Sequence, residues 1–129
     1  MAETEKITIN LGPVDLGRID VLVEQGLYSN RTDLIRTAIR NLLDRHEPVV
    51  QELATRRSFV LGTMSLDRHA LEEALAEGKR LSMNIIGSLQ LADDIDEDLA
   101  RAAIRSITVR GVFRAPQRLK EALADRTKS

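Results

Sequence analysis

The chain has 129 residues, of which 43% are hydrophobic, 2% aromatic and 30% charged, and its formal net charge is −1. This length suits one average domain or two small ones, with a core built mainly from aliphatic side chains. The lack of cysteine excludes disulfides, thiolate metal sites and cysteine nucleophiles, and it fits a reducing cytoplasm. No apolar stretch is long enough to predict a membrane span, and none near the N-terminus predicts a signal peptide.

The first predicted element is a strand over residues 6–11, in which polar and apolar residues alternate with a period of two. Pro13 ends it, because proline cannot donate a hydrogen bond to a sheet. A helix follows and stops at Gly26, a residue typical of left-handed helix C-caps. A second amphipathic helix begins after Asn30, its predicted N-cap, and ends near His46.

A single strand in the first 47 residues leaves a row of backbone groups unpaired, and the segment is too short to build its own core easily. Both problems are solved if two copies pair their strands antiparallel and close four helices over the apolar face. The predicted core of this dimer comprises Ile7, Ile9, Leu11, Leu34, Ile35 and Ile39. The opposite face of the paired strands then exposes Lys6, Thr8 and Asn10.

Residues 5–46 resemble the ribbon–helix–helix repressors of the Arc/MetJ/CopG type. The resemblance rests on the strand KITINL, the turn GLYSN and the helical run RTDLIRTAIRNLL, in that order. It implies that the strand pair enters the major groove of DNA and contacts base edges through Lys6, Thr8 and Asn10. It also implies that the start of the second helix binds DNA phosphate, where free amides and the helix dipole favour anions. The residues in that position are Ser29, Asn30, Arg31 and Thr32.

Each of these residues also has a structural interpretation. Lys6, Thr8 and Asn10 could be the solvated side of any edge strand, and Asn30 would cap a helix whether or not phosphate were bound. The arginines of the second helix are interpreted as a solvated or salt-bridged face. Because the chain carries few excess positive charges, one dimer on one site is expected to bind DNA modestly.

Residues 48–57 are predicted to form a helical linker. Residues 58–125 contain an internal repeat. Aligning Gly62, Gly87 and Gly111, which are 25 and 24 residues apart, superimposes three units of one short strand and one helix. Repeats of this kind predict parallel strands side by side in a solenoid-like β–α domain. A small βαβ domain of another topology is the alternative. The open edges of such a sheet predict self-association or a protein partner.

The predicted fold is therefore α+β, with a ribbon–helix–helix domain over residues 1–47, the helical linker and a β–α repeat domain. The predicted function is a cytoplasmic, nucleoid-associated transcriptional regulator that binds double-stranded DNA and acts as a repressor. We expect a homodimer or a higher oligomer formed through the C-terminal domain. No catalytic residues, cofactor, metal or membrane partner is predicted, since no nucleophile–base pair, phosphate loop or metal-ligand spacing occurs.

Two other functions fit the same sequence. An antitoxin would combine a ribbon–helix–helix segment with a segment that sequesters a toxin, although such segments are usually disordered or a lone helix. A structural scaffold or filament protein would use the N-terminal segment only to dimerise.

Overall fold

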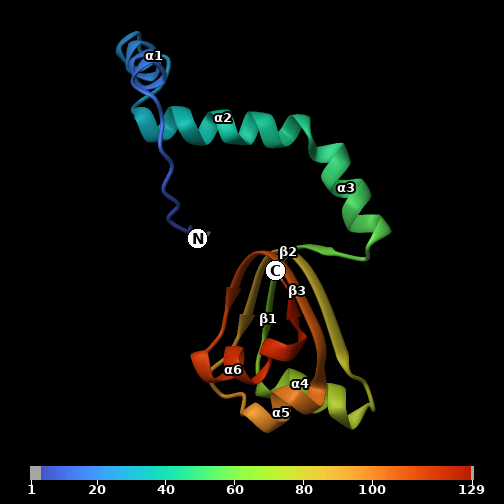
Figure 1. Cartoon of the computed structure of the whole chain (residues 1–129). Helices are drawn as coiled ribbons and strands as arrows, with labels where there is room; N and C mark the ends of the chain where they lie inside the picture. Colours follow the sequence, from blue (N-terminus) through green and yellow to red (C-terminus); the bar gives the residue numbers. More distant parts are fainter. Residues whose placement is uncertain (1–3, 129) are drawn as a thin grey trace. The chain divides into compact units, whose positions relative to one another are not determined.

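The computed structural model describes residues 4–128, and within this range the chain forms six α-helices and one four-stranded parallel sheet (Figure 1). The predicted α+β class is confirmed. The chain divides into two compact units, Met1–Pro48 and Val49–Ser129, which are described separately below. Residues 49–57 of the predicted linker thus group with the C-terminal unit, and Pro48 with the N-terminal unit.

The N-terminal unit contains two helices, α1 (Pro13–Glu24) and α2 (Arg31–Arg45), joined by a turn. Proline at the start of α1 suits a position whose amide has no partner within the helix. Gly26 has a φ of 80°, which L-residues rarely adopt, and this permits the turn after α1. The predicted strand over residues 6–11 is not formed in the single chain, where residues 4–12 have neither helical nor strand structure.

Helix α3 (Glu47–Arg56) corresponds to the predicted helical linker. The amide of Phe59 donates to the carbonyl of Ala54 at 2.8 Å, and Ala54 is buried. This hydrogen bond lies at the end of α3, and the sheet begins at Val60.

The C-terminal sheet consists of parallel strands in the order β1-β2-β3-β4, as the sequence predicts for its three repeat strands. The strands are β1 (Val60–Leu66), β2 (Leu81–Leu91), β3 (Ile104–Arg114) and β4 (Thr127–Lys128). The intervening helices are α4 (Arg68–Ala76), α5 (Glu97–Ala103) and α6 (Gln117–Ala122), and a 3-10 turn, η1 (Ala124–Arg126), precedes β4. Helix α5 contacts both α4 and α6, so the helices follow one another in the same order as the strands.

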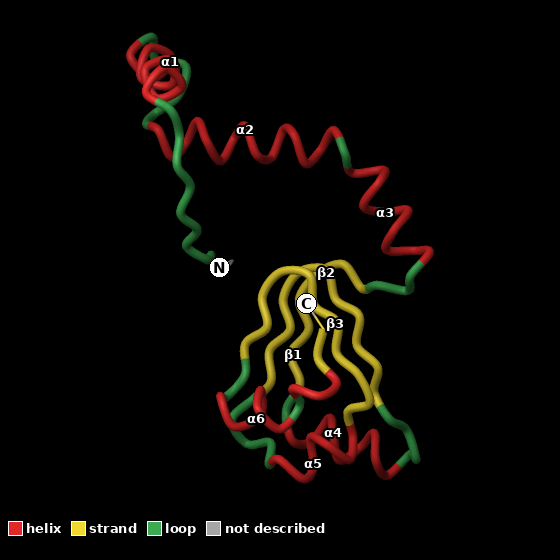
Figure 2. The backbone as a smooth tube through the Cα atoms, in the orientation of Figure 1, coloured by secondary structure: helices red, strands yellow, loops and turns green. Residues whose placement is uncertain are grey.

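The three glycines of the repeat lie in one row across the sheet, with Gly62 opposite Gly87 and Gly87 opposite Gly111. Their φ angles are 144°, 140° and 131°, a region open essentially to glycine alone. Strand β2 has 11 residues and α5 only 7, so the helix rises about 10 Å where a straight strand would span about 36 Å. The two long strands β2 and β3 therefore bend, and Figure 2 shows them arching so that both ends return towards the helices.

The core of the C-terminal unit draws on the strands and on the helices α4, α5 and α6. Among its fully buried side chains are Leu71, Ile85, Leu89, Ile95, Ile104, Ile107, Leu119 and Leu123. Helices α4 and α5 begin after their N-caps, Asp67 and Asp96, whose carboxylates accept hydrogen bonds from the amides of Ala70 at 2.9 Å and Leu99 at 2.7 Å. No helix within residues 4–128 has the length and apolar character needed to cross a bilayer.

Candidate nucleic-acid interface

The N-terminal segment is exposed along its whole described length. Ile7, Ile9 and Leu11 are 72%, 55% and 39% exposed, and Lys6, Thr8 and Asn10 are exposed as well. Exposed isoleucines in an extended stretch are costly in water, because each fully buried side chain of this size contributes roughly 1.5–3 kcal/mol. The single chain therefore leaves unused the apolar face that the sequence assigned to a dimer core.

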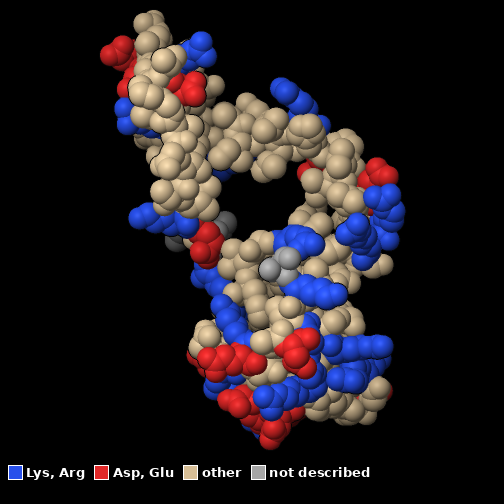
Figure 3. All heavy atoms as spheres, viewed as in Figure 1, with Lys and Arg blue, Asp and Glu red and all other residues tan. Residues whose placement is uncertain are grey.

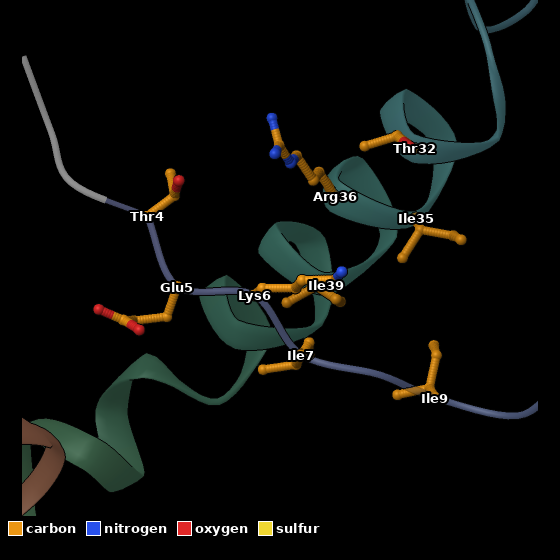
Figure 4. Close-up of a pocket in the computed structure, with 9 residues that line it drawn as sticks. All are labelled: Thr4, Glu5, Lys6, Ile7, Ile9, Thr32, Ile35, Arg36 and Ile39. Carbon is orange, nitrogen blue, oxygen red and sulfur yellow. The ribbon is translucent and has the colours of Figure 1, made fainter.

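A groove lies between this segment and α2 (Figure 4). Ile7 and Ile9 line it from the segment, and Ile35 and Ile39 line it from the helix. Its remaining lining residues are Thr4, Glu5, Lys6, Thr32 and Arg36. Four residues of the predicted dimer core are thus brought to one groove. Lys6 also reaches this groove, so the alternation of polar and apolar faces is not clean at this residue in the single chain.

No side chain in the described part of the N-terminal unit is buried. Leu34 and Ile35 are half-buried, and Ile39 is 43% exposed. Large apolar side chains on α1, on α2 and in the turn between them are also exposed, namely Val14, Val21, Leu22, Leu27, Leu42 and Leu43. In the view of Figure 3 the surface along α2 is mostly uncharged. A unit with this surface has no hydrophobic core of its own.

Asn30 caps α2 as the sequence predicts. Its side-chain oxygen accepts a hydrogen bond from the amide of Asp33 at 2.8 Å. The Asp33 carboxylate accepts one from the amide of Ser29 at 3.0 Å, one residue earlier than a standard capping box would require. The amides of Arg31 and Thr32 lie in the first turn, where the helix offers no carbonyl acceptor. The cap therefore leaves part of the predicted anion site available.

The Arg31 side chain forms a two-point ion pair with Asp20 of α1. Its Nε donates to Oδ1 at 2.8 Å and its Nη2 to Oδ2 at 2.9 Å. The hydrogen bonds from Arg31 lower the pKa of the Asp20 carboxyl, and those to Asp20 raise the pKa of the Arg31 guanidinium. Sequence reasoning placed Arg31 on phosphate and missed Asp20, since no local pattern connects residues eleven positions apart.

A second, polar groove lies beside the start of α2. Asn30 and Thr32 line it together with Arg36 and Arg40, and Asp33 and Thr37 complete the lining. The sequence interpretation assigned Arg36 and Arg40 to a solvated or salt-bridged face. The structure brings both guanidinium-bearing residues to the groove that also contains the predicted phosphate-binding residues.

The acidic cluster at residues 93–98 of the C-terminal unit has structural roles. Asp96 caps α5, and Asp94 accepts a hydrogen bond from the amide of Arg68 at 3.1 Å. The carbonyls of Asp93 and Ile95 each accept a hydrogen bond from Arg118 at 2.6 Å. Within residues 4–128, no group of three or more histidine or acidic residues is arranged to hold a metal ion.

Comparisons with known proteins point to a family of transcriptional regulators. Residues 2–120 match the model of the Ribbon-Helix-Helix transcriptional regulator family. A stretch of 42 residues is 31% identical to the transcriptional regulator CdrS of Halobacterium salinarum, covering 33% of this chain and 76% of that protein. No solved structure matches the chain.

Proposed function

The chain belongs to the Ribbon-Helix-Helix transcriptional regulator family, and we propose that it represses transcription as a homodimer whose paired N-terminal segments enter the major groove of DNA. A DNA-binding transcriptional regulator is the function that family membership and the likeness to CdrS support. The repressor role, the dimer and the contact residues are the steps that we add.

The proposal of a dimer rests on one observation, namely that no side chain within residues 4–48 is buried. Ile7, Ile9, Ile35 and Ile39 already line one groove, and a second copy of residues 6–11 would supply the hydrogen-bond partner that the segment lacks. Pairing the two segments antiparallel would cover the groove from both chains. The proposed core retains Leu11 and Leu34 beside these four residues.

Lys6, Thr8 and Asn10 are the proposed base-contacting residues. When two N-terminal segments pair as strands, here called the ribbon, successive side chains point to opposite faces. These three side chains therefore point away from Ile7 and Ile9. Lysine can donate to guanine O6 or N7, asparagine can pair with adenine through two hydrogen bonds, and threonine offers a hydroxyl and a methyl group. All three are exposed in the single chain, so the ribbon could present them without rearranging a core.

The start of α2 is the proposed phosphate site. Backbone amides of its first turn, the Ser29 hydroxyl and the positive end of the helix dipole favour an anion there. Arg36 and Arg40 in the adjoining polar groove add positive charge. The charge of Arg31 is already paired with Asp20. These contacts would fix the position of the ribbon on DNA and carry little sequence information.

Selection from random duplexes at fixed salt tests the proposal, with the full chain compared with Lys6→Ala and Asn10→Ala. We expect each variant to dimerise normally and to lose about 1–3 kcal/mol of discrimination at the base it contacts. Gln25→Ala, an exposed polar residue at the C-terminal end of α1, is the matched control and should select the same sites as the wild type. The ribbon is not the reading element if both ribbon variants also select those sites.

We further propose that the C-terminal unit joins dimers into higher oligomers, which would raise the occupancy of DNA through effective concentration. The unit has a buried core and an ordered sheet, so it differs from the disordered or lone-helix segment expected of an antitoxin.

A further inference from the structure

The two edges of the C-terminal sheet differ in how they are protected. The described part of β4, Thr127–Lys128, carries the exposed Lys128 and pairs with Ile107 and Thr108. A lysine on an edge strand is a typical device against unwanted strand pairing. Strand β1 is seven residues long, has no charged residue and no proline, and pairs with no described strand on the side away from β2. Among the described residues, the β4 side of the sheet thus carries Lys128 and the β3 arginines Arg105 and Arg110, whereas the β1 edge carries no charge.

Exposed apolar side chains of the C-terminal unit are concentrated at the β1 end. Val60 and Leu61 on β1 are 50% and 47% exposed, although Val60 pairs with the fully buried Ile85. Leu75 on α4, the helix that follows β1, is 38% exposed. The other large exposed apolar side chains described in this unit, Val49 and Leu53, lie on α3, which leads into β1. None of those described lies on the elements from β2 to β4.

The backbone at Gly62 leaves room for a neighbouring strand. A Cβ built on Gly87 would lie 2.0 Å from the carbonyl oxygen of Gly62, and one on Gly111 would lie 2.0 Å from the carbonyl oxygen of Gly87. A Cβ on Gly62 would meet nothing within 4 Å. Strand β1 thus has the same bend as its neighbours, with the adjoining space open.

We propose that β1 pairs with β1 of a second copy of this chain, antiparallel about a two-fold axis, so that Val60 and Leu61 of both copies become covered. A head-to-tail arrangement would instead place this apolar edge against the end that carries Lys128 and Arg110 and no exposed large apolar side chain among the described residues. In a two-fold contact, both copies use the same surface, so this contact is complete when two copies have joined. This inference rests on the proposed assembly of dimers into higher oligomers, and it assigns that assembly to the β1 edge of the sheet.

Sedimentation of the full-length chain tests the contact separately from the N-terminal ribbon. Ile9→Asp removes an apolar side chain from the proposed ribbon core, and this variant should remain a dimer through β1. Adding Val60→Lys should convert it to a monomer, because a paired edge would bury the new charge. Adding Ser82→Lys, at an exposed residue of β2 that pairs with β3 and not with β1, is the matched control and should leave the dimer intact. A monomeric Ile9→Asp variant, or a double variant with Val60→Lys that stays dimeric, would overturn the proposal.

A cross-linking measurement covers the case in which Val60→Lys disturbs folding. The chain has no cysteine, so a single introduced thiol reports on one contact. Thr63 is the central residue of β1 and would face its counterpart across the two-fold axis, at a spacing that a disulfide can bridge. Thr63→Cys should give a covalent dimer on oxidation, and Ser88→Cys, its neighbour on β2, should not. Equal yields from the two variants would contradict β1 pairing.

Failure of this inference and failure of the proposed function give different results. If β1 does not pair, Lys6→Ala and Asn10→Ala still change sequence preference and Val60→Lys leaves DNA affinity unchanged. If the ribbon does not read DNA, the ribbon variants keep the preference of the wild type while Thr63→Cys still forms its covalent dimer.

Discussion

Arg31, the first residue of α2, is joined to Asp20 of α1 by two parallel hydrogen bonds. The pair links the two helices of the N-terminal unit across the turn that contains Gly26. It also neutralises a positive charge at the place where a DNA phosphate is expected to bind. The ion pair therefore stabilises the helix pair at the expense of charge available to DNA.

Replacing Asp20 by asparagine should strengthen DNA binding. The substitution frees the Arg31 guanidinium for phosphate, so the slope of log affinity against log salt should steepen by about 0.9 for each additional phosphate that is neutralised. Asp15→Asn removes the same charge from α1 without touching Arg31, and it should change the slope less. Fluorescence anisotropy over a salt series measures both. Identical slopes for the two variants would show that Arg31 does not reach phosphate.

The Asp20–Arg31 pair should respond to pH only under acidic conditions. Because Arg31 lowers the pKa of Asp20, the carboxylate stays charged to a lower pH in the folded chain than in the unfolded chain. Its contribution is thus present above the unfolded pKa, near 3.9, and is lost as pH falls through the lowered folded value. A carboxyl NMR titration should place Asp20 below its ordinary range in the wild type and near that range in Arg31→Ala. Equal values in both proteins would contradict the pairing.

Removing the cap of α2 should weaken the N-terminal unit. Asn30→Ala loses the hydrogen bond to the Asp33 amide and should lower the free energy of unfolding by about 1 kcal/mol. Asn30→Ser keeps a capping oxygen and should cost only a few tenths of that amount. Denaturant titration at fixed protein concentration gives the difference, since a dimer's stability depends on concentration. If Asn30→Ser lowered the free energy of unfolding as much as Asn30→Ala, the loss would not come from the capping hydrogen bond.

Alanine at Gly87 should disrupt the C-terminal sheet. The added Cβ would lie 2.0 Å from the Gly62 carbonyl oxygen, and its φ of 140° is strained for any L-residue. We expect a loss above about 4 kcal/mol, the range of the most damaging substitutions. Gly78→Ala is the control, because Gly78 also has a positive φ, of 71°, but open space around it. Thermal unfolding should show a much smaller loss for Gly78→Ala, and similar losses would mean that strain alone decides.

Features that depend on nearby residues were predictable from the sequence. Asn30 was predicted as a helix cap because a capping side chain bonds to an amide three residues on, and Asp67 and Asp96 follow the same rule. The parallel sheet and its glycine row were also predictable. Glycines that recur after 25 and 24 residues fall opposite one another when strands pair in register.

Features that depend on distant residues or on a second chain were not predictable in the same way. The Asp20–Arg31 pair requires α1 and α2 to meet at one angle, which no local pattern encodes. The strand over residues 6–11 is absent from the single chain, because strand structure requires hydrogen bonds to a neighbour that this chain does not supply. Arg36 and Arg40 were assigned to a solvated or salt-bridged face, since helical spacing does not reveal a groove.

The glycine row also bears on how the C-terminal unit acquires its structure after synthesis. Neighbouring strands pair 20 to 25 residues apart along the chain, so the loops that must close during folding are of similar length. Parallel pairings over such separations form more slowly than the local contacts of a helical bundle, because each loop must close before its pairing is made. A folded pair of strands offers the next one a ready edge, so order should spread from strand to strand through the unit.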